Sequence, residues 1–202
     1  MPQPKYGGIL LLSKEALPDF QYDVTPYVDE DSGLAVCWAT SLEQNAKPFS
    51  YFRRLSSFTE RQILAFYESS FSQTLVGVDH VTGNSDRHEG NFLYIDEMRY
   101  LAIDQGSVGG GAFWHTMWPD AYAQNQIFDR TKATLSNASF SKWSAKAILE
   151  VEATYQVWES LPDTLRPILR NLLNDEQISI IFEYLATRSE PGHFKNKIGK
   201  LL

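Results

Sequence analysis

The chain has 202 residues, of which 43% are hydrophobic and 13% aromatic, so it can bury a sizeable core and is not a disordered segment. Its formal net charge of −7 argues against general nucleic-acid binding, which usually needs a basic surface. The single cysteine, Cys37, excludes an internal disulfide, and neither a membrane-length apolar run nor a signal-peptide pattern occurs, so we expect a cytoplasmic protein without membrane contact.

The first 50 residues predict a small β region. Short apolar runs at 8–12 and 34–38 are typical of strands, and the loop between them is rich in acidic residues. Residues 44–58 contain Pro48 and several polar side chains, which indicates a linker.

Residues 59–78 predict one long helix. Thr59 followed by Gln62 has the form of a capping box, in which each residue satisfies a backbone donor of the other. Apolar side chains then recur at three- and four-residue spacing up to Val78, as one face of a helix requires. The helix leads into a polar loop over 79–91, where we expect His80 to cap or pack rather than to bind a ligand.

Residues 92–103 predict a β-hairpin. Two apolar runs of strand length, 92–95 and 100–103, flank a polar break. A hairpin brings its outer ends together, so Asn91 before the first strand and Asp104 after the second should become neighbours.

The remainder predicts a loop followed by helices. The segment after Asp104 is rich in glycines and aromatic residues, which favours either a substrate loop or a connection whose aromatic side chains dock on the core. Amphipathic patterns predict helices over 142–159 and 162–173 and another beginning at Asn174, with Gln177 completing a capping box. The lysine-containing tail, 193–202, predicts a frayed end or a small docking surface.

The loop and the hairpin carry three oxygen-bearing side chains suited to phosphoryl transfer. Transfer from ATP needs a carboxylate that accepts the proton of the acceptor hydroxyl, and an amide oxygen and a carboxylate that hold Mg²⁺ against the phosphates. Asp86, Asn91 and Asp104 match these roles in that order. We expect Arg87 to brace the loop by pairing with an acid, and His88 to brace it by hydrogen bonding backbone carbonyls.

The segment Asn84-x-Asp86-Arg87-His88-x-x-Asn91, with Asp104 in an Ile-Asp-x-Gly context, resembles the catalytic and metal-binding loops of HipA-like kinases. Ordinary protein kinases place His-Arg before the aspartate. The inverted order found here is similar to that of the HipA-like kinases and of their phosphoinositide-kinase relatives. The resemblance covers roughly residues 75–118, including the aromatic segment 111–118.

This resemblance implies an α+β, protein-kinase-like fold with ATP and Mg²⁺ as cofactors and a serine or threonine of a protein as acceptor. Residues 1–50 would form an incomplete small lobe with a hinge beside adenine, or simply two ordinary strands with a solvated loop. Residues 51–202 would form a helical large lobe with a catalytic loop at 79–91 and a metal loop at 104–118. The implied catalytic residues are Asp86, Arg87, His88 and Asn91, and the implied metal ligands are Asn91 and Asp104.

The first 85 residues depart from the family pattern, because they contain neither Gly-x-Gly-x-x-Gly nor Val-Ala-Ile-Lys. Lys14 is the nearest candidate for the phosphate-binding lysine, with a solvated residue at a strand end as the alternative. Residues 1–4 resemble a Leu-Pro-x-Pro that follows this lysine in family members, so the chain would begin midway through the small lobe. The sequence therefore allows an active kinase, a pseudokinase or interaction module, or a kinase subunit whose small lobe another chain supplies. Two questions stay open: which molecule accepts the phosphate, and whether the protein belongs to a toxin–antitoxin pair.

A metal-dependent or serine hydrolase is not indicated. The four histidines lack zinc-ligand spacing and form no His-Glu-x-x-His, and the chain has no serine nucleophile elbow.

Overall fold

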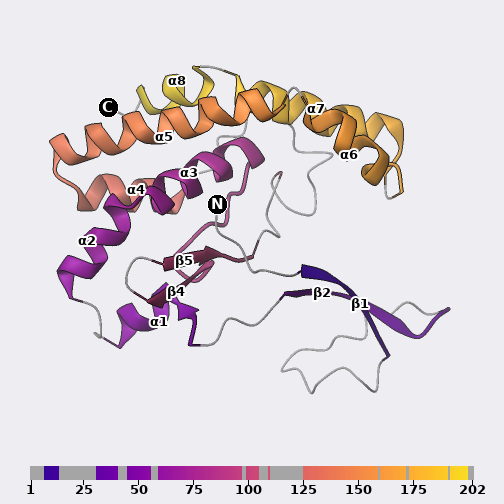
Figure 1. Cartoon of the computed structure of the whole chain (residues 1–202), viewed down its shortest axis with the longest axis horizontal. Coiled ribbons are helices and arrows are strands. Elements are labelled where there is room, and N and C mark those ends of the chain that lie inside the picture. The colour runs from indigo at the N-terminus through magenta and orange to yellow at the C-terminus, as the bar shows by residue number, and fades with distance from the viewer. Residues whose placement is uncertain are drawn as a thin grey trace. The chain divides into compact units, whose positions relative to one another are not determined.

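The protein is described from a computed structural model, which combines a mostly helical body with small antiparallel sheets (Figure 1). The chain divides into a smaller unit, Gln3–Asn45, and a larger one formed by Ala46–Leu202 with Met1–Pro2. The structure describes residues 7–13, 31–40, 45–55, 59–96, 99–104, 109, 125–158, 160–171, 173–190 and 192–199.

The smaller unit contains the two predicted strands. β1 (Gly7–Ser13) and β2 (Leu34–Thr40) pair antiparallel, from Gly7 opposite Thr40 to Ser13 opposite Leu34. Lys14, the predicted phosphate ligand, lies outside the described residues, and so do residues 41–43, which follow β2 in the predicted hinge.

The larger unit contains the predicted hairpin within a three-stranded sheet. β4 (Phe92–Asp96) and β5 (Arg99–Ala102) pair antiparallel, and β3 (Lys47–Pro48) pairs with the other side of β4. The hairpin prediction is therefore confirmed.

The linker predicted over residues 44–58 is wrong in part, because this stretch contains β3 and the short helix α1 (Phe49–Arg54). Phe49 is fully buried, with its ring centroid 4.7 Å from that of Phe66 and 5.1 Å from that of Phe92. The segment is thus part of the core of the larger unit.

The predicted long helix is divided in two, α2 (Glu60–Glu68) and α3 (Ser70–Thr82). The capping box of Thr59 and Gln62 is present at the start of α2. Ser69 has extended backbone angles and ends α2, and its hydroxyl accepts the N–H of Ser72 to begin α3. The apolar spacing continues across this break, which is why the pattern indicated a single helix.

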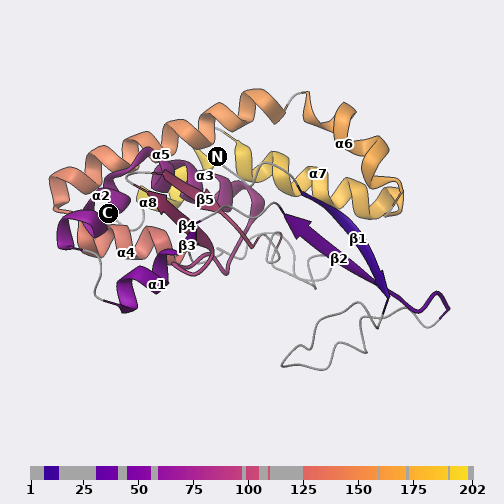
Figure 2. The same ribbon diagram turned by 60° about the horizontal axis from the view of Figure 1, so that its bottom comes forward.

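The remaining described helices are α4 (Gln126–Thr134), α5 (Asn137–Trp158), α6 (Leu161–Leu169), α7 (Asp175–Ser189) and α8 (His193–Gly199). In Figures 1 and 2, α3 runs beside the long α5, and α7 lies next to both. Gly77 of α3 allows this close approach, since a Cβ there would lie 3.3 Å from the Val151 side chain of α5. No helix in the described part of the chain is both long and apolar enough to cross a membrane.

In the tail, for which a frayed end or a small docking surface was predicted, residues 193–199 form the helix α8. Its Phe194 and Ile198 are buried in the core, so this part of the tail is not frayed. The capping box at Asn174 and Gln177 is present at the start of α7, as the sequence predicted.

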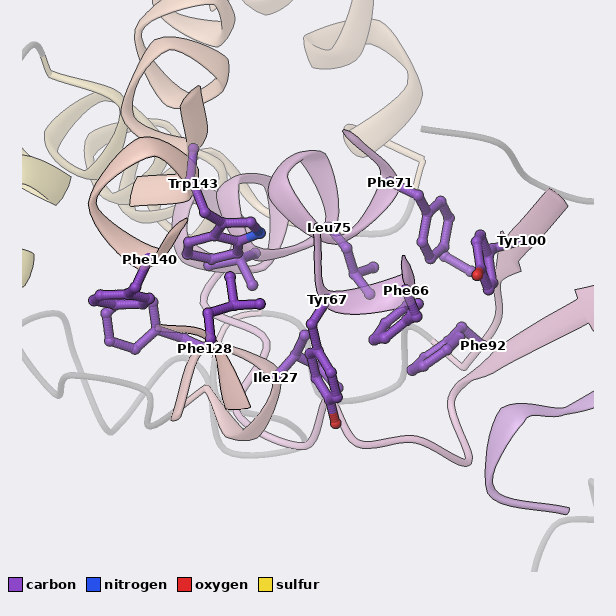
Figure 3. Close-up of a cluster of buried hydrophobic side chains, with 14 of the residues drawn as sticks. Phe66, Tyr67, Phe71, Leu75, Phe92, Tyr100, Ile127, Phe128, Phe140 and Trp143 are labelled. Carbon is purple, nitrogen blue, oxygen red and sulfur yellow. The ribbon is translucent and has the colours of Figure 1, made fainter. Parts of the chain in front are cut away.

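One aromatic core joins the hairpin to the helices (Figure 3). Phe66 of α2 stacks on Phe92 of β4, with ring centroids 4.5 Å apart and planes 8° apart. On the α4–α5 side, Phe140 stacks on Trp143, whose indole N–H donates to the hydroxyl of Ser72 at 2.9 Å. These contacts, at the two ends of the aromatic core, hold α2 and α3 against the sheet. They thereby also hold the loop that joins α3 to β4.

Candidate functional site

The loop between α3 and β4 starts with a defined helix end. Gly83 follows α3 with φ +66, a left-handed conformation that suits glycine. Its N–H donates to the carbonyl of His80, and the N–H of Asn84 donates to the carbonyl of Asp79. The side-chain oxygen of Asn84 then accepts the N–H of Asp86 at 3.2 Å, so the backbone of Asp86 is held by a local turn.

Arg87 lies in the interior, where it forms an ion pair with Asp79 of α3. Neither side chain is exposed, and Arg87 Nε lies 3.0 Å from Asp79 Oδ2 while a terminal nitrogen donates to Oδ1 at 3.1 Å. Burial raises the pKa of Asp79, and hydrogen bonds and charge from Arg87 oppose that shift. The prediction that Arg87 pairs with an acid is confirmed.

The same guanidinium joins the two ends of the hairpin. Arg87 Nη1 donates to the carbonyl of Asn91 at 2.7 Å and to the carbonyl of Ile103 at 2.6 Å. The N–H of Ile103 also donates to the carbonyl of Asn91, at 3.0 Å. Asn91 and Asp104, the residue after Ile103, therefore lie at one end of the hairpin, as the sequence predicted.

Asp86 is connected to this hairpin end through Asn91. The side-chain Nδ2 of Asn91 donates to the backbone carbonyl of Asp86 at 3.1 Å. Asn91 is 3% exposed, whereas Asp86 and Asp104 are exposed. The amide that positions the loop is thus buried, and the two carboxylates are accessible to a ligand.

Asp104 has an uncommon backbone conformation, with φ +56. Few non-glycine residues adopt a positive φ, although aspartate tolerates it better than most, and such positions are frequent in functional sites. Asp104 lies two residues after the end of β5 and is the first residue of the candidate metal loop.

No group of three or more histidine, cysteine, aspartate or glutamate side chains that could hold a metal lies within the described residues. The residues at the hairpin end whose oxygen atoms would hold a Mg²⁺ ion are Asn91 and Asp104. Mg²⁺ in nucleotide sites is commonly held by one or two carboxylates with substrate phosphates, so this donor set fits the ion.

His88 differs from its prediction, because it bonds a backbone N–H rather than backbone carbonyls. Its Nδ1 accepts the N–H of Gly90 at 2.9 Å, so the ring folds back over the loop. This geometry leaves Nε2 to carry the ring proton. His80, predicted to cap or pack, contacts the ring nitrogen of His193 at 3.0 Å and packs on Phe194. Of the predicted metal loop 104–118, only Asp104 and Gly109 belong to the described residues.

Two sets of polar residues near the loop were not indicated by the sequence. The first set is Asp79, which pairs with Arg87, and Asn125, whose side-chain amide donates to the Asp79 carboxylate at 3.4 Å. An aspartate within the apolar pattern of α3 was the available signal. The second set is Glu89 and the arginines around it, Arg53 and Arg130, which are too distant in sequence to form a motif.

Comparison with known proteins identified no family model that matches the chain, and no match among curated proteins.

Proposed function

We propose that this chain is an ATP:Mg²⁺-dependent phosphotransferase of the HipA-like kinase type, acting on a serine or threonine hydroxyl of a protein. One observation carries the proposal: buried Arg87 holds the carbonyls of Asn91 and Ile103, which brings Asn91 and Asp104 to one end of the hairpin. Residues thirteen apart in sequence thereby become neighbours, and Asn91 contacts the backbone of Asp86.

The three residues have distinct roles in this proposal. Asp86 is exposed, and its carboxylate accepts the proton of the acceptor hydroxyl. Asn91 and Asp104 hold Mg²⁺, which neutralises charge on the phosphates when ATP is bound. Arg87 is a positioning residue, because its side chain is fully buried and its guanidinium bonds other groups of the protein.

The burial of Arg87 favours a catalytic role for this loop over a purely structural one. Taking an arginine and an aspartate out of water costs several kcal/mol per ion, and a well-packed apolar pair is often as stable. The pair here orients four groups at once: both oxygens of Asp79 and the carbonyls at the two ends of the hairpin. Fixed geometry of this kind is what a site for two oxygen donors and a proton acceptor requires.

A second candidate function is a pseudokinase or interaction module, or a kinase subunit completed by another chain. The observation that favours it is the lack of a Gly-x-Gly-x-x-Gly and of a Val-Ala-Ile-Lys before Asp86. In that case the loop geometry would be kept while the groups that bind the phosphates of ATP would be missing or supplied in trans.

Calorimetry with a non-hydrolysable ATP analogue separates these candidates. For an active kinase we expect Mg²⁺-dependent binding that Asp104→Asn strongly weakens and Asp86→Asn retains, while each variant loses phosphate transfer by at least about 10²-fold. Asp96→Asn is the matched control, since Asp96 is an exposed aspartate at the opposite end of the hairpin.

The absence of nucleotide binding by the chain would refute the proposal as stated. Binding that appears only after addition of the product of a neighbouring gene would instead establish the split arrangement. Equal loss of transfer in Asp96→Asn would show that the effects of the other two variants are not specific to the site.

A further inference from the structure

A cavity of about 420 Å³ lies beside the candidate catalytic loop and is lined by basic side chains. The helix α1 contributes Arg53 and Arg54, and the helix α4 contributes Arg130. The loop contributes His88 and Glu89, which follow Asp86 and Arg87 directly in the sequence. We call this space the arginine cavity.

Glu89 organises the arginine cavity from within. Its Oε1 contacts Arg53 Nη1, accepts from Arg130 Nη1 at 2.8 Å and accepts from the hydroxyl of Tyr67 at 2.7 Å. Burial, followed by the hydrogen bond to Glu89, raises the pKa of Tyr67, so this hydroxyl stays a donor. One buried carboxylate thus holds the guanidinium groups of two arginines, and each of these arginine side chains remains 44% exposed.

The charge of the arginine cavity is not balanced by its own residues. Three arginines, Arg53, Arg54 and Arg130, line the cavity with the single carboxylate of Glu89, so the arginine and carboxylate groups together carry a formal charge of +2. Arg54 is exposed and forms no ion pair with another described residue. This local surplus stands against a formal net charge of −7 for the whole chain.

We propose that the arginine cavity binds a phosphomonoester dianion, such as the phosphate of a phosphorylated serine side chain. A dianion balances the surplus charge, and the planar guanidinium groups provide paired donors that match phosphate oxygens. Ser50 and Gln126, which also line the cavity, add neutral polar groups. The volume exceeds that of a lone phosphate, so the group would enter attached to a side chain or a small organic molecule.

Occupation of the arginine cavity would act on the catalytic loop through Glu89. The carbonyl of Glu89 accepts the N–H of Ser50 at 3.0 Å, so α1 and the loop are joined by backbone as well as by side chains. A dianion that draws Arg53 and Arg130 away from Glu89 therefore loosens the side-chain contacts that hold the segment following Asp86. The inference does not depend on the proposed kinase activity, because the binding requires neither nucleotide nor Mg²⁺.

Titration calorimetry of the full chain with O-phosphoserine and with inorganic phosphate, without nucleotide and at fixed ionic strength, tests this inference. We expect saturable binding at one site, and at least about tenfold weaker binding in Arg54→Gln, since a charge-assisted hydrogen bond to phosphate is lost. Arg170→Gln is the matched control, because Arg170 is exposed, paired with Asp175 and outside the cavity.

Glu89→Gln gives a result of opposite sign. It removes the negative charge while retaining an oxygen acceptor, so the affinity for phosphate should rise, which a loss of folding would not produce. Tighter binding of O-phosphoserine than of phosphate assigns the cavity to a phosphorylated side chain, and equal binding assigns it to the phosphate group alone. Binding no stronger than that of acetate, equal loss in Arg170→Gln, or weaker binding in Glu89→Gln would overturn the proposal.

Discussion

The buried ion pair of Asp79 and Arg87 gives the sharpest test of how the loop is held. Asp79→Asn keeps one side-chain oxygen that can accept from Arg87, but it removes the negative charge. Because Arg87 is fully buried, its charge then loses the carboxylate with which it forms an ion pair. Removing one partner of a buried pair costs about 3–5 kcal/mol, so we expect a loss of unfolding free energy of that size.

The expected loss of unfolding free energy corresponds to a lower melting temperature. For a chain of 150–250 residues, 1 kcal/mol lowers Tm by about 2–4 °C, so Asp79→Asn should melt about 6–20 °C below the wild type. Urea unfolding followed by tryptophan fluorescence measures the free energy, and buried Trp143 supplies a core probe. The control Asp96→Asn breaks an exposed pair with Arg99 and should leave the unfolding midpoint nearly unchanged.

A double-mutant cycle separates the ion pair from general damage to the core. Arg87→Met removes the second charge, so Asp79→Asn combined with Arg87→Met should be more stable than the sum of the two single losses allows. If Asp79→Asn shifts the midpoint no more than Asp96→Asn does, or if the two losses simply add, the ion pair does not hold the loop as described.

Three further predictions concern the core and the helix end. Phe49→Ala should cost about 3–5 kcal/mol in urea unfolding because its ring is fully buried, whereas a loss below about 1 kcal/mol would show that the segment behaves as a linker. Gly83→Ala should destabilise the chain clearly more than Gly192→Ala, for which left-handed strain alone costs about 1–2 kcal/mol. Both glycines have positive φ, but a Cβ on Gly83 would lie 1.5 Å from the hydroxyl of Tyr184, whereas a Cβ on Gly192 would meet nothing within 4 Å. Equal melting temperatures of the two variants would therefore contradict the packing around Gly83. Burial raises the pKa of Tyr100 to about 12 from 10.0, so the unfolded chain loses this proton first and stability should fall between pH 10 and pH 12. Tyr100→Phe should show a shallower fall in alkaline denaturation, and an unchanged slope would exclude this tyrosine as a cause.

Local patterns in the sequence predicted most of the secondary structure around the site. The capping boxes at Thr59 and Asn174 were recognisable because cap and partner are three residues apart and satisfy each other's backbone donors. The hairpin was predicted from two apolar runs across a polar break, and its closure placed Asn91 near Asp104. These features depend on neighbours along the chain, so they can be read without the fold.

The break between α2 and α3 shows where local patterns stop being sufficient. Ser69 has a residue type that suits either a cap or an exposed helix position, and the apolar spacing runs through it. The extended backbone at Ser69 became evident in the tertiary structure, where it changes the direction of the chain while Phe66 and Phe71 remain in one core.

By itself the sequence determined the residue types of the candidate site and their order: a carboxylate, an amide and a second carboxylate across a loop and a hairpin. The tertiary structure decided which groups hold them, since Arg87 reaches Asp79 and both hairpin ends, and Glu89 gathers arginines from α1 and α4. The physical reason is that a buried charge requires a partner close in space, and packing rather than sequence distance brings that partner near.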